Sequence, residues 1–481
     1  MNAPLLGEVR ALIGRAGAVY AGTPAEPLLR RLAARLDEPL RVAIAGRVKA
    51  GKSTLLNALV GQELAATDAS ECTRVVTWYQ NGPTYRATLF PTGGAPRQLP
   101  FGPPDLAELP PEQVDRIVVD WPSSWLRSMT LIDTPGLGSA NQAVSARTEA
   151  ALLPEQNGTN NADAVIYLMR HVHGDDVRFM EAFHDEPAER HPVNTIGVLS
   201  RADEVGHGRL DALTSAARIA ERYARDTRVR ALCQTVVPVA GLLASSAASL
   251  REREYRCVRL LAAASDADLS GLLLSADHFT GAESPAEVSP QERAALLDRL
   301  GMFGVRLAIQ LSRADTTAGA LSGELLARSG LHQLRALLTT RFAERAGLLK
   351  ARSALKAVEP VLRADGRLLP EWERIVAGAH EFAELRLIDQ IRVGAVLLTR
   401  EEGVDAERLL GGAGADVPSR LGLPHDAGES LVRRAGEDQL RRWQRRAEHP
   451  ASPRDVRDAA RVLVRTCEGI LLARARSDTR S

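Results

Sequence analysis

The residues with the clearest capacity for chemistry form a glycine-rich segment near the start of the chain. Residues 46–53 spell Gly-Arg-Val-Lys-Ala-Gly-Lys-Ser, a complete G-x-x-x-x-G-K-[ST] pattern. An apolar, strand-like run at 41–45 precedes it, and a helix-like run at 54–59 follows it. Because the backbone N–H groups of such a turn and the dipole of the following helix both attract anions, the segment predicts a nucleotide phosphate site. The residues expected to line it are Gly46, Arg47, Val48, Lys49, Ala50, Gly51, Lys52, Ser53 and Thr54.

The two lysines and the serine of this loop have distinct expected roles. Lys52 should contact the β- and γ-phosphates, and the Ser53 hydroxyl should bind Mg²⁺. Lys49 lies three residues before Lys52. It either reaches across the phosphates as an internal cationic finger, where it would stabilise the charge that develops during hydrolysis, or points to solvent. Lys49 and Lys52 are therefore both candidate catalytic residues.

A second motif, Asp133-Thr134-Pro135-Gly136, follows an apolar run 80 residues after Ser53. The Asp133 carboxylate is expected to hold Mg²⁺ through a water molecule. The Gly136 N–H is expected to reach a γ-phosphate oxygen, which would couple the next segment to the nucleotide state and makes Gly136 a candidate catalytic residue. The tetrapeptide alone is also compatible with a simple turn, but its separation from the phosphate loop favours the functional interpretation.

The segment Ser200-Arg201-Ala202-Asp203 ends another apolar run and predicts a guanine site. A carboxylate at Asp203 can accept two hydrogen bonds from the guanine edge, and adenine lacks that pair of donors. GTPases usually carry Asn/Thr-Lys-x-Asp here, so Ser200 and Arg201 depart from the pattern, although an arginine side chain can still cover the base. A surface turn with a charged pair is the alternative. After the next strand-like run, the residues expected to line the base are Val239, Ala240 and Gly241, with a strand-end turn as the alternative.

The segment 71–74, between the loop helix and the next strand, occupies the place where switch GTPases close a threonine over Mg²⁺. Thr73 is the expected residue, both as a metal ligand and as a catalytic residue, and Thr67 and Thr77 are the alternatives. Leu137 follows the Asp-Thr-Pro-Gly motif at the position where Ras-like enzymes place a water-orienting glutamine. The attacking water must therefore be held by another group.

Each of two further clusters of polar residues can be explained either by a function or by its place in the fold. His171 and His173 lie near two aspartates and could form a metal site, but a solvated loop is the simpler interpretation because nothing fixes their geometry. The basic run at 441–446 contains Trp443. On a helix, Trp443 would face a bundle and the arginines would face water, which is favoured over phosphate binding.

Composition limits the classes of function. With 481 residues, 45% of them hydrophobic, the chain should form two or three domains with sizeable cores. The net charge of +1 creates no overall field that would recruit nucleic acid, so no nucleic-acid partner is expected. The four cysteines fit neither zinc nor disulfide spacing, which favours reduced thiols in a cytoplasm. No signal peptide is expected, and the longest apolar runs are too short to span a bilayer, so a soluble protein is predicted.

Apolar periodicity divides the chain into three predicted parts: N-terminal helices at 1–39, a nucleotide domain at 40–250 and a helical region at 251–481. Helical spacing marks the first and the last part, and the last predicts an elongated antiparallel α-helical bundle. In the middle part, helices alternate with short apolar runs, which indicates a doubly wound, mostly parallel α/β sheet. The expected strands are Val42–Ala45, Val75–Gln80, Tyr85–Phe90, Arg116–Asp120, Met129–Asp133, Ala164–Met169, Thr195–Ser200 and Thr235–Ala240.

Two features of the helical parts lead to predictions about packing. The N-terminal helices carry apolar stripes, which are expected to pack on the C-terminal helical half rather than on the sheet. The segment Gly403–Gly428 is rich in glycine and contains two prolines. It predicts an exposed loop, either a membrane-contacting tip or a disordered surface segment.

Taken together, the phosphate loop, Thr73, Asp133–Gly136 and Ser200–Asp203 resemble the GTPase domain of the dynamin superfamily. The stretch Lys49–Leu59 is similar to bacterial dynamin-like proteins, and its nearest resemblance is to the actinobacterial isoniazid-inducible type. The similarity rests on motifs over residues 41–241 and on helical layout elsewhere. It implies a P-loop GTPase head on a helical neck and trunk, GTP hydrolysis to GDP with Mg²⁺, and head-to-head association with a second copy or a second dynamin-like chain.

The same resemblance implies membrane remodelling through peripheral contact with lipid. The expected location is the cytoplasm, with the inner face of the plasma membrane as a peripheral site. No paddle of unbroken hydrophobic residues and no pleckstrin-type domain is recognisable in the sequence, so the membrane contact has no identified residues apart from the glycine-rich loop.

Two other classes of function are alternatives. An Era-like regulatory or ribosome-assembly GTPase also carries Asp-Thr-Pro-Gly, but such proteins usually add a small basic RNA-binding domain, and the large, near-neutral helical half argues against one. A GTP-regulated scaffold without membrane action is the second. The dependence of GTP hydrolysis on protein concentration separates these classes, because head dimerisation predicts a specific activity that rises with concentration.

Overall fold

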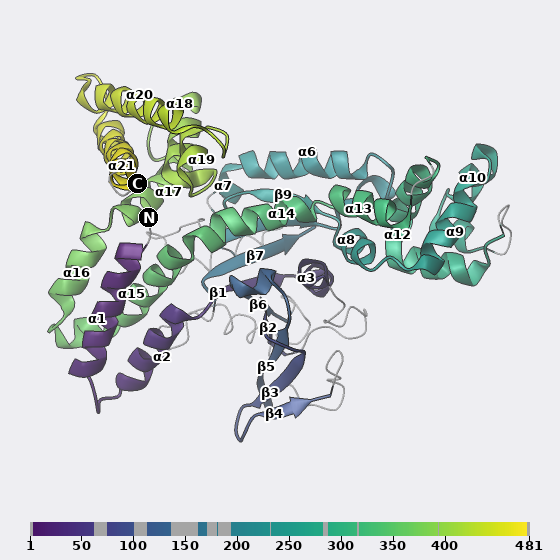
Figure 1. The fold of residues 1–481 in the computed structure, drawn as a ribbon, viewed down its shortest axis with the longest axis horizontal. Coiled ribbons are helices and arrows are strands. Elements are labelled where there is room, and N and C mark those ends of the chain that lie inside the picture. The colour runs from purple at the N-terminus through teal and green to yellow at the C-terminus, as the bar shows by residue number, and fades with distance from the viewer. Residues whose placement is uncertain are drawn as a thin grey trace.

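The computed structural model describes residues 3–61, 75–100, 113–135, 162–170, 180, 194–230, 232–281, 287–314, 317–392 and 394–478. Figure 1 shows a central sheet from which three groups of helices extend. Helices from residues 252–328 lie at the right of the view. The N-terminal helices lie with residues 346–378 at the lower left, and residues 380–478 form the group at the upper left.

The sheet has nine described strands in the order β4-β3-β5-β2-β6-β1-β7-β8-β9. Their bounds are β1 Leu40–Gly46, β2 Thr77–Asn81, β3 Arg86–Pro91, β4 Arg97–Leu99, β5 Val114–Trp121, β6 Met129–Asp133, β7 Ala164–Met169, β8 Thr195–Ser200 and β9 Val236–Val239. Five neighbouring pairs are parallel, whereas β2–β6, β3–β4 and β3–β5 are antiparallel. The mostly parallel sheet and the large helical region confirm the predicted fold class.

All eight predicted strands are present, with ends shifted by no more than two residues. β7 and β8 are buried at every position, as expected for unbroken apolar runs in a sheet that is covered on both faces. The ninth strand, β4, was not predicted. It has three residues, none of them buried, at the edge of the sheet, so it carries no hydrophobic signal.

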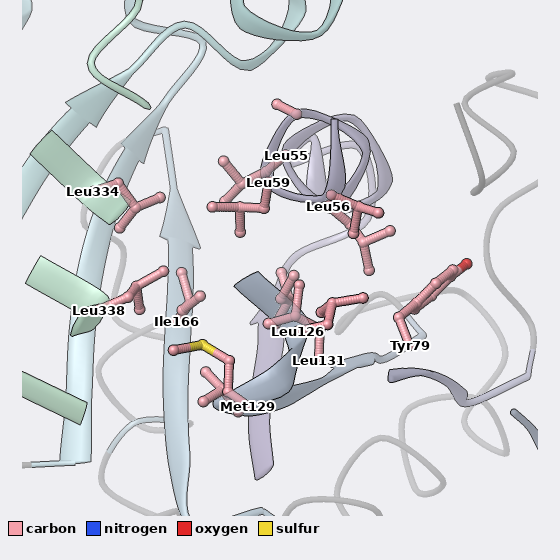
Figure 2. Close-up of a cluster of buried hydrophobic side chains, with 14 of the residues drawn as sticks. Leu55, Leu56, Leu59, Tyr79, Leu126, Met129, Leu131, Ile166, Leu334 and Leu338 are labelled. Carbon is pink, nitrogen blue, oxygen red and sulfur yellow. The ribbon is translucent and has the colours of Figure 1, made fainter. Parts of the chain in front are cut away.

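One face of the sheet packs against α3 (Lys52–Val60) and α14 (Leu331–Leu337). Figure 2 shows leucines from α3 and α14 converging with side chains of the strands. The labelled members of this cluster are Leu55, Leu56, Leu59, Tyr79, Leu126, Met129, Leu131, Ile166, Leu334 and Leu338. On the other face, α6 (Ala212–Arg225) packs against β8 and β9. The packing of α3 holds its N-terminus at the end of β1, which is where the phosphate loop must lie.

The helices from residue 252 to 328 form a hydrophobic core with α8 (Gly241–Ala248), separate from the core over the sheet. They are α9 Glu252–Ala262, α10 Asp266–Leu272, α11 Ala276–Thr280, α12 Pro290–Ser312 and α13 Ala318–Arg328. Four of them, α10 to α13, begin with a hydroxyl side-chain cap. On α12, for example, the Ser289 hydroxyl accepts from the Glu292 N–H, and on α13 the Thr317 hydroxyl accepts from the Ala320 N–H. This helical group, which we call the α9–α13 group, adjoins the end of the sheet at β9.

A nearly continuous helical segment leaves the sheet and joins the N-terminal helices. α14 continues through a π-helical turn (η5, Leu338–Phe342) and a short 3₁₀ turn (η6, Ala343–Arg345) into α15 (Ala346–Asp365). α15 then shares a core with the helices at the lower left of Figure 1. They are α1 Ala3–Val19, α2 Glu26–Asp37 and α16 Leu369–Gly378. The prediction that the N-terminal helices pack on the C-terminal half rather than on the sheet is confirmed.

The remaining helices form a third core around Trp443, which is 1% exposed, as its position in the basic run predicted. They are α17 His380–Arg392, α18 Arg400–Glu407, η7 Arg408–Gly412, α19 Val417–Leu421, α20 Glu429–Glu448 and α21 Arg454–Asp478. Shorter elements elsewhere are η2 Trp125–Arg127, η4 Ala202–His207 and α7 Thr227–Arg230. Within the described residues, none of the helices combines the length and the apolar composition needed to cross a bilayer.

The prediction of an exposed loop at Gly403–Gly428 is wrong. Most of the segment is helical, and Leu409, Leu410 and Leu421 are 5% exposed or less because they pack into the core around Trp443. Several of its glycines lie where other atoms come so close that a side chain would not fit. A Cβ at Gly412 would lie 2.4 Å from the carbonyl O of Glu407.

Candidate nucleotide-binding site

The phosphate loop lies where the sequence pattern placed it, between β1 and α3. Gly46 ends β1 with φ of 149°, and a Cβ there would lie 2.6 Å from the carbonyl O of Leu168, so only glycine fits this close approach to β7. The Nζ of Lys52 donates to the carbonyl oxygens of Gly46 and Arg47, each at 3.3 Å. The ammonium of Lys52, which is 7% exposed, is thereby held over the loop. Lys49 is exposed and has φ of 63°.

Ser53 and Asp133 meet at the edge of the sheet because β6 is the parallel neighbour of β1, with Ile44 paired to Asp133. The Ser53 hydroxyl donates to Asp133 Oδ2 at 3.3 Å, and Asp133 is 1% exposed. The next residue, Thr134, donates its hydroxyl to the carbonyl O of Ile44 at 2.9 Å, which fixes the start of the Asp-Thr-Pro-Gly segment. A hydroxyl and a carboxylate at this spacing are the oxygen donors that Mg²⁺ prefers, so the residues present fit this ion.

A pocket of about 150 Å³ opens between the phosphate loop and the ends of β8 and β9. Parallel pairing sets Ser200 opposite Val239, which brings the two predicted base-binding segments together. The residues lining the pocket are Ala50, Gly51, Thr54, Leu55, Leu168, Val198, Ser200, Arg201, Asp203, Glu204, Val239, Gly241 and Leu242. Four of its polar residues, Ser200, Arg201, Asp203 and Glu204, come from the end of β8 and the turn after it, and most of the others are apolar. This mixture suits a flat heterocycle with polar edges.

Asp203 is the most strongly perturbed group of this pocket. It is 6% exposed, and burial raises the pKa of its carboxyl from 3.8 to about 6. A hydrogen bond from its own backbone N–H and the charge of Arg201 oppose this rise, whereas the charge of Glu204 adds to it. A ligand that donates hydrogen bonds to this carboxylate would offset the cost of its burial.

Arg201 connects the base side of the pocket to the phosphate side. Its Nη2 donates to the carbonyl O of Lys49 at 3.1 Å, and its Nη1 forms an ion pair with Glu204 at 2.6 Å. The Ser200 hydroxyl donates instead to the carbonyl O of Met169 at 3.3 Å. Although Arg201 replaces the lysine of the Asn/Thr-Lys-x-Asp pattern, a cationic side chain therefore still contacts the phosphate loop.

Two of the three residues in the third predicted base segment line the pocket. Val239 and Gly241 line the pocket, whereas the Ala240 N–H donates to the carbonyl O of Ser329 at 2.9 Å. Glu204 and Leu242 were not predicted, although each directly follows a predicted residue. Their contribution arises from the turn after β8 and from the start of α8.

Several predicted residues lie outside the described part of the chain. They are Thr67, Thr73, Gly136, Leu137, His171, His173, Asp175 and Asp176. Of the threonine candidates, Thr77 is described. It is buried on β2, pairs opposite Asp133, and its hydroxyl donates to the carbonyl O of Val75 at 3.4 Å.

The sheet, the loop at the end of β1 and the pocket beside it define a P-loop GTPase domain. In agreement, residues 41–196 match the family model described as 50S ribosome-binding GTPase. Isoniazid-induced protein IniC of Mycobacterium tuberculosis is 38% identical over 482 residues, covering 96% of this chain and 97% of that protein. The chain therefore belongs to the IniC family of dynamin-like GTPases.

Two further proteins are similar to this chain, one over a shorter part of the chain and the other at lower sequence identity. A bacterial dynamin-like protein of Nostoc punctiforme is 33% identical over 147 residues, which is 27% of this chain and 20% of that protein. A solved structure of an oligomerised bacterial dynamin pair aligns over 98% of this chain and 80% of that chain, with 13% identity and a TM-score of 0.35.

Proposed function

We propose that this GTPase binds GTP with Mg²⁺ through the residues described above and couples hydrolysis to association with a second dynamin-like head and to membrane remodelling. One observation carries the proposal. The ends of the parallel strands β1, β6 and β8 bring Lys52, the Ser53–Asp133 pair and Asp203 to the same edge of the sheet. A single nucleotide with its metal ion can therefore contact all of these residues at once, through its phosphates, the ion and its base.

On the phosphate side, Lys52 would exchange its two loop carbonyls for the β- and γ-phosphate oxygens. Ser53 and Asp133 would hold Mg²⁺, Asp133 through water. The ion would neutralise charge on the phosphates. Lys49, exposed at the loop, is free of the sheet and can swing over the phosphates as a cationic finger. Thr73 and the Gly136 N–H retain their expected roles as the switch ligand and the γ-phosphate contact.

On the base side, the Asp203 carboxylate would accept from the ring N–H and the exocyclic amino group of guanine. Arg201 fixes the phosphate loop and the base segment relative to each other through its hydrogen bond to the carbonyl O of Lys49. Adenine presents an acceptor where guanine presents the ring N–H, so it would leave the buried carboxylate without that partner. Such a mismatch costs more than the loss of a single contact.

A route for coupling begins beside the base. The Ala240 N–H bonds to Ser329, and α14 starts two residues later. Gly330 lies so near β9 that a Cβ there would be 2.3 Å from the carbonyl O of Pro238. Movement at this edge would therefore be transmitted to α14 and, through η5, to α15 and the N-terminal helices. Membership of the IniC family and the resemblance to dynamins support association and membrane action as the output.

The test is the specific rate of GTP hydrolysis measured over a range of protein concentrations, with and without liposomes, for the parent chain and for Lys52→Ala. We expect a rate that rises with concentration, rises further on liposomes and is lost in Lys52→Ala. A specific rate that stays constant with concentration would reject head association. Absence of protein from floated liposomes would reject the membrane part and leave a GTP-regulated scaffold.

A further inference from the structure

The loop that carries Asp203 has an unfavourable backbone conformation. Gly206, His207 and Gly208 have φ of 62°, 61° and 68°, and Arg201 at the start of the loop has φ of 52°. Left-handed conformations are rare for residues with side chains such as Arg201 and His207, and they persist only where the surroundings fix them. Arg201 is held by its ion pair with Glu204, and at His207 the contact comes from a neighbouring element.

Arg306 of α12 supplies this contact. Its Nη1 donates to the carbonyl oxygens of His207 at 3.1 Å and Gly208 at 2.6 Å. Its Nη2 donates to the carbonyl oxygens of Leu273 at 2.6 Å and Leu274 at 3.4 Å, just beyond the end of α10. Among the described residues all four acceptors are backbone carbonyls, so one planar guanidinium ties the Asp203 loop to α10.

A kink in α12 brings the helix beside the same loop. Gly301 has φ of 64° and ψ of 169° within the helix, and a Cβ there would lie 3.8 Å from Asp203 Oδ2. From the other side of the loop, a Cβ at Gly208 would lie 3.3 Å from the backbone N of Phe303. Because α12 belongs to the core of the α9–α13 group, the position of Asp203 depends on a group of helices outside the sheet.

We propose that Arg306 is a positioning residue for guanine recognition, which holds the Asp203 loop so that the carboxylate can accept both guanine donors. This inference rests on the proposed assignment of Asp203 to the base. If Arg306 has this role, selectivity for guanine depends on the α9–α13 group as well as on the motif at the end of β8. Arg306 lies about one hundred residues further along the chain than this motif.

The ratio of GDP affinity to inosine diphosphate affinity tests this role, because inosine lacks the exocyclic amino group that the second carboxylate oxygen would bind. In Arg306→Gln we expect GDP affinity to fall about tenfold, as for loss of a charged hydrogen-bonding group, with a smaller loss for inosine diphosphate. Arg306→Lys, which keeps the charge but can reach one pair of carbonyls, should restore part of the ratio. Arg313→Gln is the matched control at the end of the same helix, where an exposed ion pair with Asp266 is removed and the ratio should stay unchanged.

The outcomes separate this inference from the proposed function. An unchanged ratio in Arg306→Gln, together with a lower Tm, would assign Arg306 a purely structural role and overturn the inference. If Arg306→Gln does not fold, the ratio of GDP affinity to inosine diphosphate affinity is measured in Arg306→Lys instead. An unchanged ratio in that variant would likewise overturn the inference. An unchanged ratio in Asp203→Asn would instead reject the base site itself, whereas a fall in Asp203→Asn without one in Arg306→Gln would reject only the role of Arg306.

Discussion

Replacing Asp203 by Asn should weaken guanine binding and at the same time stabilise the protein in the absence of nucleotide. The carboxyl is 6% exposed, and its burial raises the pKa from 3.8 to about 6. At about 1.36 kcal/mol per pKa unit, this difference corresponds to roughly 3 kcal/mol of destabilisation at neutral pH. Because a buried amide keeps part of the desolvation cost, the expected gain in Asp203→Asn is about 1–2 kcal/mol.

The pH dependence of this gain has a definite sign. Between about pH 4 and pH 6 the folded protein binds a proton at Asp203 that the unfolded chain has lost, so the stability of the parent falls as pH rises through this window. The advantage of Asp203→Asn should therefore be largest above pH 6. At pH 5 the parent carboxyl is mostly protonated when folded, so the advantage should shrink by about 1.4 kcal/mol and come close to zero.

Urea unfolding of nucleotide-stripped protein at pH 7.5 and pH 5 measures both quantities, and competition between GDP and xanthosine diphosphate measures the base preference. The variant should lose GDP affinity and gain relative affinity for xanthosine. Asp211→Asn, at an exposed aspartate that pairs with Arg209, is the control and should change neither. A variant no more stable than the parent at pH 7.5, or an advantage that is the same at both pH values, would refute the reasoning.

Three further predictions follow from single contacts. Lys52→Ala should lower GTP affinity at least about tenfold and abolish turnover, because the loop loses its buried cation; hydrolysis at the parental rate would remove Lys52 from the phosphate site. Gly46→Ala should lower the free energy of unfolding by about 2 kcal/mol or more, because its Cβ would lie 2.6 Å from a backbone oxygen of β7, and an unchanged Tm in calorimetry would contradict this. Trp443→Ala should destabilise the C-terminal core by about 3–5 kcal/mol and leave GDP affinity unchanged, since that core excludes the sheet; a weakened GDP titration would show otherwise.

Sequence reasoning succeeded where local pattern and burial agree. The strand at Ala164–Met169 is buried at every position and has no polar residue except Tyr167, so its pattern admits few other structures. The phosphate loop was equally predictable, because Gly46 and the turn after it are required by close approach to β7 and by the helix that follows. In both cases the sequence signal itself lies within about ten residues along the chain, although the contact of Gly46 with β7 joins distant segments.

The failures have a different origin. Helical periodicity shows that α12 has an apolar face, but not that this face packs against α8 instead of the N-terminal helices. The glycines at 411 and 412 suggested a loop, although they allow Arg345 to donate to the Gly411 carbonyl and Glu407 to approach closely. Arg306 left no signal at all, because its acceptors are backbone carbonyls that any sequence would supply.

A junction between the sheet and two groups of helices lies at residues 338–345. Residues 338–345 form the π-helical and 3₁₀ turns between α14, which packs on the sheet, and α15, which packs on the N-terminal helices. Arg341 of this junction donates to Gln234 beside β9 at 3.4 Å, while Arg345 donates to the carbonyl of Gly411 in the C-terminal group. Turns of this kind are weaker than an α-helix and often mark hinges. Because α14 also begins at the contact between Ser329 and Ala240, a shift at the base edge would reach both the N-terminal helices and the C-terminal group through this one segment.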